Sequence, residues 1–290
     1  MRRLLSLAFV TAAACGPQVA DRVSVMAVDR LSGEVAAHEV ELPGFDPATV
    51  RGPAAVVLDQ GATPSCGTRR KVVGVVMAAS PRCAWLFSAY ASLERARQFL
   101  ISAGAEAQAP VLVQASDQSA AAVSWSPQSD TLTLGTGPRG ARVAAGLNAG
   151  AVARELARRQ LRGLFASHPE EAEGIALFLG AAASGDAGYL SLSDAQGDPA
   201  GELDLSRPLR EPRPADALAG ALWAWADASG DLLSAAKAAL AASRALDRSA
   251  PGDAAFVLSL VAAQLDGAER DQACAIFRAR LQGAQIPACP

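Results

Sequence analysis

The spacing of apolar residues changes near residue 147, and this change limits the fold class. Before it, short runs rich in Val are separated by Gly and Pro, as in Val23–Leu42, Ala54–Leu58 and Val72–Met77, which is typical of strands. Ala84–Ser102 is the exception, with apolar residues at helical spacing. After residue 147 the helical spacing continues to the end. The sequence therefore predicts an α+β fold, with a mixed sheet-and-helix part over 23–146 and a mostly helical part over 147–290.

Turn and capping residues give approximate bounds for the other elements. Short strands are expected at Val111–Gln114, Ala121–Trp125 and Thr131–Leu134. Two consecutive helices follow: one from an Asn148 cap to Arg162, and one from a capping box at Ser167–Glu170 to Gly185. The last helices are expected at Ala215–Ala228, Leu232–Leu246, Asp253–Leu265 and Ala268–Leu281.

The first residues have the pattern of an export signal. Arg2 and Arg3 precede a short apolar run, Leu4–Val10, and small residues lead into Cys15. This arrangement resembles a lipobox, so residues 1–15 are expected to be a lipoprotein signal and 16–22 a tether. The resemblance implies an exported protein held by lipid on Cys15 in the bacterial envelope, at the outer membrane or the periplasmic face. The alternative is an ordinary signal cleaved before an incidental Cys.

Four further cysteines, at 66, 83, 274 and 289, suit an exported chain with two disulfides. Three pairings are possible, and proximity favours Cys66–Cys83 and Cys274–Cys289. No C-x-x-C spacing occurs, which argues against a thiolate zinc site. The net charge is −3 and the longest basic run is only Arg69–Lys71, so nucleic acid is not an expected partner.

Several strings, in order, resemble gluzincin metallopeptidases, the thermolysin-like class. Val152-Ala-Arg-Glu-Leu-Ala-Arg158 stands where that family has V-A-H-E-x-x-H, and Glu173-Gly-Ile-Ala-Leu177 where it has E-G-x-x-D. Ala122–Trp125 with Leu132–Leu134 resembles the hairpin along the substrate cleft, and Gly220–Trp223 a later G-A-L-W string. The similarity covers roughly residues 80 to 283 and implies a zincin-like fold.

The resemblance also implies that the zinc chemistry is lost. Two His at i and i+4 share one helix face and bind Zn²⁺ together with a Glu from the next helix. Here both His positions are arginines, Arg154 and Arg158, while Glu155 at the base position and Glu173 at the third-ligand position remain. Arg cannot lose its proton to become a ligand. The other histidines, His38 and His168, are expected to be exposed or capping, so neither metal nor cofactor is expected.

The charges suggest what the arginines do instead. Without Zn²⁺, Glu155 and Glu173 would repel each other, whereas guanidinium groups restore positive charge and can bridge carboxylates. We therefore expect Arg154 and Arg158 to pair with Glu155 and Glu173 and to join the two helices. The alternative is that one or both arginines point to solvent.

These observations predict a surface-anchored pseudopeptidase without catalytic residues, whose role is binding or structural and whose partner is a peptide or envelope protein. Two alternatives stay open. One is a hydrolase that uses Glu155 and another group without zinc, or with metal held elsewhere. The other is an unrelated lipoprotein whose helices form an interaction platform. The glycine-rich stretch Gly135–Gly140 lacks the G-K-[ST] ending of a phosphate loop and is expected to be a plain loop.

Overall fold

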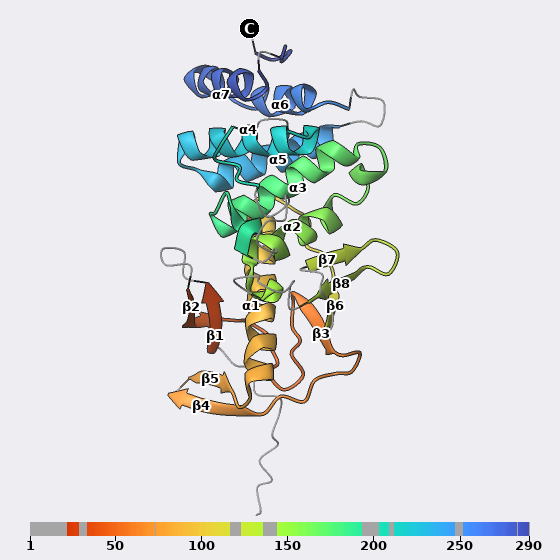
Figure 1. The fold of residues 1–290 in the computed structure, drawn as a ribbon, viewed down its shortest axis with the longest axis vertical. Helices are drawn as coiled ribbons and strands as arrows, with labels where there is room; N and C mark the ends of the chain where they lie inside the picture. The colour runs from red at the N-terminus through yellow and green to blue at the C-terminus, as the bar shows by residue number, and fades with distance from the viewer. Residues whose placement is uncertain are drawn as a thin grey trace, which may run out of the picture.

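The computed structural model describes residues 22–28, 34–72, 74–116, 123–135, 144–192, 203–208, 212–246, 252–282 and 284–289. The expected signal with Cys15, the tether before Arg22 and residues 136–140 of the glycine-rich stretch lie outside this set. Helices and strands are mixed along the chain, which confirms the α+β class (Figure 1).

Two four-stranded sheets occupy one end of the molecule. In the first, the order is β2 (Val35–Glu41), β1 (Arg22–Val28), β5 (Val75–Ala78) and β4 (Thr68–Val72). The expected N-terminal hairpin is present, since β1 pairs antiparallel with β2 from Arg22–Glu41 to Val28–Val35. β5 pairs parallel with β1 and antiparallel with β4, which is an edge strand.

The second sheet has the order β3 (Ala55–Asp59), β6 (Val111–Ala115), β8 (Thr131–Leu134) and β7 (Val123–Ser126). The first three strands run parallel, and β7 runs antiparallel at the edge. The turn between β7 and β8 places Asp130 at a positive φ of 49°, a conformation that Asp tolerates better than most residues.

The long helix α1 (Pro81–Ser102) connects the two ends of the molecule. It contacts β1 and β5 of the first sheet, β3 of the second, and the helices α2 (Ala149–Gln160) and α3 (Pro169–Ser184). Figure 1 shows the sheets on either side of α1 and the later helices stacked beyond it. Short 3₁₀ turns lie at Ala145–Leu147, Leu164–Ala166 and Tyr189–Leu192.

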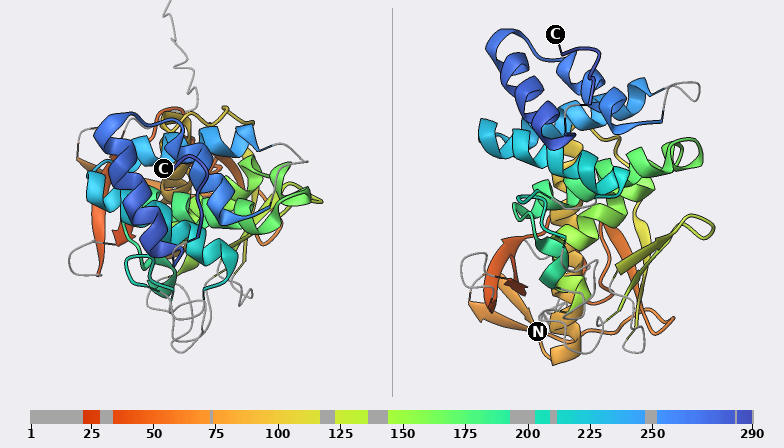
Figure 2. Two further views of the ribbon diagram at one scale, coloured as in Figure 1. Left: turned by 90° about the horizontal axis from the view of Figure 1, so that it is seen from above. Right: turned by 45° about the horizontal axis from the view of Figure 1, so that its top comes forward.

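Four helices complete the far end: α4 (Pro214–Ser229), α5 (Leu232–Ala245), α6 (Ala254–Ala262) and α7 (Gly267–Arg280). The right view of Figure 2 shows these helices grouped at the end away from the sheets. Trp225 in α4 is buried against Phe277 in α7, with ring centroids 6.0 Å apart. Trp225 is therefore part of the core between α4 and α7.

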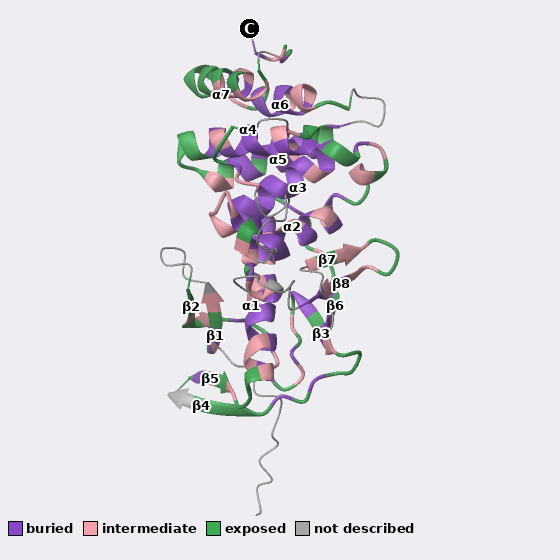
Figure 3. Cartoon of the chain, viewed as in Figure 1, coloured by how far each residue is buried: buried purple, intermediate pink, exposed green. Residues whose placement is uncertain are grey.

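Buried residues run without a break from the sheets through α1 to the C-terminal helices (Figure 3). The two disulfides have the pairing that proximity favoured, Cys66–Cys83 and Cys274–Cys289, with Cα–Cα distances of 5.7 and 5.4 Å. The first attaches the loop before β4 to the start of α1, and the second attaches the C-terminal residues to α7. No helix in the described ranges has both the length and the apolar content that a membrane span requires.

Three expectations need correction. The run Val72–Met77 is not continuous: β4 ends at Val72, and Gly74, at φ 83°, precedes β5. The capping box at Ser167 is absent, because α3 begins at Pro169 and the N-cap position falls on His168. His168 itself makes no side-chain cap bond and is only 4% exposed, so neither capping nor exposure accounts for it. His38 is exposed, as expected.

Candidate functional site

Helices α2 and α3 pack closely because glycines face each other at their contact. A Cβ on Gly150 would lie 2.6 Å from the ring of Tyr189, and a Cβ on Gly180 would lie 2.8 Å from the carbonyl oxygen of Gly150. Tyr189, 1% exposed, fills the space beside both glycines. The Asn148 side chain caps α2 by accepting from the Ala151 N–H at 3.1 Å, and its amide donates to the Tyr189 carbonyl at 2.7 Å. These contacts fix the position of one helix against the other.

The two arginines of α2 reach Glu173 on α3. Arg154 Nε donates to Glu173 Oε1 at 3.0 Å, and a second guanidinium nitrogen contacts the same oxygen. Arg158 Nε lies 3.1 Å from Glu173 Oε2, and this contact is an ion pair without a hydrogen bond. Among the described residues, that oxygen has no hydrogen-bond donor. The expected pairing of both arginines with Glu173 is confirmed.

Glu155 lies between the arginines and the second sheet. Its side chain is 3% exposed, and its two oxygens lie 3.3 and 3.2 Å from Arg158 Nη1. Arg154 Nη1 is 4.0 Å from Oε1, and the Trp125 N–H of β7 donates to Oε2 at 2.9 Å. The expected pairing with Glu155 is confirmed as well. We call Arg154, Glu155, Arg158 and Glu173 the Arg–Glu cluster.

Burial changes the titration of the cluster. It raises the pKa of the Glu155 carboxyl above its usual range, although Arg154, Arg158 and the Trp125 N–H oppose the rise. Burial also disfavours the charge on Arg154, but the nearby Tyr189, Glu173 and Glu155 outweigh this and raise the pKa of the guanidinium. An arginine keeps its charge in proteins, so any change of protonation in the cluster falls on a carboxyl group.

Beside the cluster lies an ion pair that the sequence analysis missed. Arg159 Nε and Nη2 donate to the two oxygens of Asp130 at 2.8 and 2.7 Å, and Nη1 donates to the Ala109 carbonyl at 3.0 Å. Asp130 also accepts from Trp125 Nε1 at 3.1 Å. The bonds from Arg159 lower the pKa of the Asp130 carboxyl. They attach α2 to the β7–β8 hairpin.

The charged side chains of the Arg–Glu cluster form ion pairs with one another. Each carboxylate faces a guanidinium, and Arg158 also stacks on the Phe165 ring at 5.3 Å. Chemically, Glu155 is shielded from solvent, accepts hydrogen bonds from Arg158 and the Trp125 N–H, and also faces Arg154, which is a poor situation for a general base. Within the described ranges, no group of three or more His, Cys, Asp or Glu side chains is placed to hold a metal ion.

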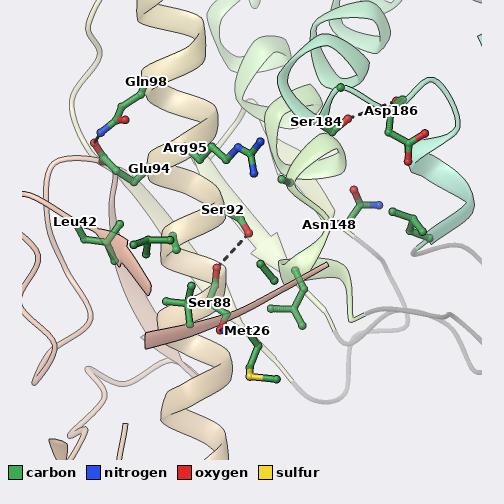
Figure 4. Close-up of a pocket in the computed structure, with 18 of the residues that line it drawn as sticks. Met26, Leu42, Ser88, Ser92, Glu94, Arg95, Gln98, Asn148, Ser184 and Asp186 are labelled. Atoms are coloured by element: carbon green, nitrogen blue, oxygen red, sulfur yellow. Dashed lines mark hydrogen bonds between the residues drawn. The ribbon is translucent and has the colours of Figure 1, made fainter. Parts of the chain in front are cut away.

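A separate cavity of about 460 Å³ lies between the β1–β2 hairpin, α1, the start of α2 and the end of α3. Figure 4 shows Arg95 of α1 extending into the space between α1 and the ends of α2 and α3, where Asn148, Ser184 and Asp186 lie. Apolar side chains such as Val25, Val40 and Leu147 line other parts. No motif of the sequence predicts this cavity, and none of the cluster residues lines it.

Cys15, the expected lipidation site, lies outside the described residues. The comparison of the chain with models of protein families and with curated proteins found no match.

Proposed function

We propose that this chain is a lipid-anchored envelope protein with a non-catalytic, zincin-like body in which two arginines stand in place of a zinc ion. The observation that carries the proposal is the Arg–Glu cluster. Arg154 and Arg158 stand four residues apart on one helix, and both contact Glu173 from the next helix. In a zincin this is the spacing of the two His ligands and the third ligand.

The surroundings of the cluster support the proposal. A hairpin with an antiparallel edge strand, β7, lies beside α2, as the sequence resemblance implies for the strand along a substrate cleft. α1 packs against both α2 and the sheets. The positions of β7 and α1 support a zincin-like arrangement of elements. The proposed family itself is argued from the motif positions in α2 and α3.

The same contacts argue for a structural role of the cluster and against hydrolysis. Guanidinium groups neither bind a metal nor accept a proton. Glu155, which would have to activate water, is buried and bonded to Trp125 and Arg158. Removal of either carboxylate would leave two half-buried guanidinium groups to share the remaining one, which is unfavourable. We infer that the cluster holds α2, α3 and β7 together.

Restoring the histidines tests the proposal directly. The double variant Arg154→His/Arg158→His, in the folded full chain, is expected to bind one zinc ion per molecule through both His and Glu173. Metal content after gel filtration and cobalt absorption spectra measure this. Two matched controls are expected to bind no zinc: the same variant with Glu173→Gln, and Arg154→His/Arg159→His, in which the two side chains do not share a face. A folded double variant without zinc would show that the positions are not those of a zincin.

The anchor is tested separately. Intact mass of the protein purified from membranes is expected to show a diacylglyceryl group on Cys15, which Cys15→Ser removes. A mature chain without lipid would contradict the anchor and leave the zinc test unaffected.

The cavity favours binding as a second candidate function. Its volume is within the range of small-molecule sites, and it combines apolar walls with a few polar groups. Filling it with Ala91→Phe is expected to abolish binding of any ligand recovered with the native protein, while Ala91→Ser is expected to retain it. Native mass spectrometry of both variants distinguishes the outcomes.

A further inference from the structure

The chain between Gln60 and Leu93 carries four cations, Arg69, Arg70, Lys71 and Arg82, and no Asp or Glu. The stretch is thus positively charged, whereas the whole chain has a net charge of −3. The structure uses this stretch for β4, β5 and the first half of α1. These elements form the end of the molecule opposite α6 and α7 (Figure 1).

The cations of β4 lie on an open edge. β4 is the outer strand of its sheet, and both Arg69 and Arg70 are exposed. Arg82, in contrast, is paired with Asp59, with Nε 3.2 Å from Oδ2. Met77 of β5 is directly opposite Arg69 in the register and is 37% exposed. Met77 and Arg69 thus share one face of the sheet, while Arg70, opposite Val76, projects from the other face of the same edge. An exposed methionine beside an exposed arginine combines apolar and basic contacts, as surfaces that bind lipid headgroups do.

The position of β1 brings this edge close to the proposed anchor. Arg22 begins β1 and is paired with Val75 of β5, which in turn is paired with Val72 of β4. Two strand spacings therefore separate Arg22 from the end of β4, a distance of about 10 Å. Only seven residues lead from Cys15 to Arg22, and they reach at most about 25 Å. Lipid on Cys15 would thus keep β4 close to the membrane surface.

We propose that the β4 edge, through Arg69 and Arg70, binds the headgroups of anionic lipids and orients the body on the membrane. This inference rests on the proposed anchor at Cys15 for the direction in which the edge faces. Lipid on one residue fixes a distance and leaves the body free to rotate. Basic residues near the surface add attraction to anionic lipid, and this attraction decreases over a Debye length. A second, electrostatic contact therefore selects one orientation.

The experiment uses the full chain with Cys15→Ser, so that binding does not depend on lipidation. Co-sedimentation is measured with vesicles of phosphatidylcholine alone and with vesicles in which about one lipid in three is phosphatidylglycerol. We expect stronger partition onto the anionic vesicles, and loss of the difference at high salt. Arg69→Glu/Arg70→Glu is expected to weaken partition onto anionic vesicles at least about 30-fold, given the attraction per basic residue.

A matched control makes the same charge change elsewhere. Arg207→Glu/Lys237→Glu changes two exposed residues near the other end of the molecule and is expected to change partition less than about threefold. If the Glu variant does not fold, Arg69→Gln/Arg70→Gln replaces it, and a smaller loss of partition onto anionic vesicles is expected. Equal partition onto neutral and anionic vesicles, or equal losses in both Glu pairs, would overturn the proposal.

The anchor and the basic edge fail in different ways. Lipid on Cys15 of the unsubstituted chain, without any preference for phosphatidylglycerol, refutes the basic edge and leaves the anchor intact. If the unsubstituted chain carries no lipid on Cys15 while the Cys15→Ser chain prefers phosphatidylglycerol, the anchor is refuted and β4 is retained as a lipid-binding edge.

Discussion

The backbone N–H of Trp125 in β7 donates a hydrogen bond to Glu155 Oε2 in α2 across 2.9 Å. The contact joins an edge strand to a buried carboxylate that also faces two arginines. An unpaired N–H on an edge strand can accept another strand as a partner, so this bond closes one position of the edge. It also gives Glu155 a structural role that can be measured.

Glu155→Ala is expected to destabilise the protein by about 1–3 kcal/mol, because the Trp125 N–H loses its acceptor and Arg158, which is 33% exposed, keeps only Glu173 as a partner. Denaturant unfolding measures the loss. Asp271→Ala, at an exposed position on α7, is the control and should change the free energy of unfolding by less than about 0.5 kcal/mol. Similar values for the two variants would show that the cluster contributes little to stability.

Glu155→Gln is expected to change how stability depends on pH. Folding raises the pKa of Glu155, so the folded protein binds more protons than the unfolded chain between the two pKa values. The wild type should therefore lose stability as the pH rises from the ordinary carboxyl range through the raised value. The difference in unfolding free energy between wild type and Glu155→Gln, followed over that range, isolates the contribution. If the difference changes in the opposite direction with pH, the arginines lower the pKa of Glu155 more than burial raises it.

Arg159→Lys is expected to cost about 1–2 kcal/mol, since a lysine cannot donate to both oxygens of Asp130 and to the Ala109 carbonyl in one planar geometry. The expected loss of stability is small because the Asp130 side chain is 41% exposed, and solvent screens its ion pair with Arg159. The pKa of Asp130, followed by NMR, should rise towards its ordinary value in the variant. In the wild type the contribution is present above the unfolded pKa and is lost as the pH falls through the lowered one. An unchanged Asp130 pKa would contradict this assignment.

Gly150→Ala is expected to destabilise the protein by about 1–3 kcal/mol, because its Cβ would overlap the buried Tyr189 ring. Gly163→Ala is the matched control, since a Cβ there meets nothing within 4 Å. Introducing Tyr189→Ala together with Gly150→Ala should cost less than the sum of the two single changes. Strict additivity would show that the ring moves aside without cost.

Reduction of both disulfides is expected to lower the unfolding free energy by several kcal/mol, about 3 for each loop of this length. Thermal unfolding of Cys66→Ser/Cys83→Ser and Cys274→Ser/Cys289→Ser, each against the wild type with and without reductant, apportions the effect. A wild type that is insensitive to reductant would show that the bonds do not form in the purified protein.

Local patterns of the sequence were sufficient to predict most elements. Asn148 caps α2 as expected, and the alternating Val residues of β1 form a hairpin strand. β4 was missed because Thr-Arg-Arg-Lys-Val has too few apolar residues to suggest a strand. It forms through pairing with β5, which a single-sequence pattern does not reveal. His168 was misassigned for a similar reason: its burial comes from packing between distant segments.

The pairing within the Arg–Glu cluster was predictable because four positions on two adjacent helices carry balanced charges. The partners from the sheet were not. Nothing local links Trp125 to Glu155, or Asp130 to Arg159, since about thirty residues separate the members of each pair. Such contacts depend on how α2 packs on β7. The cavity is likewise a property of packing, and no residue type in it marks its presence in the sequence.

The packing of α1 determines how cooperatively the protein unfolds. One continuous helix carries Leu86 and Phe87 in its first half and Leu93 and Leu100 further on, all fully or almost fully buried. It touches both sheets as well as α2 and α3, and Cys83 ties its first turn to the loop before β4. Both ends of the molecule pack on α1. Unfolding of either end therefore removes packing that α1 needs, and the other end unfolds with it. Despite the change of pattern near residue 147, we expect the described body to unfold in one cooperative transition.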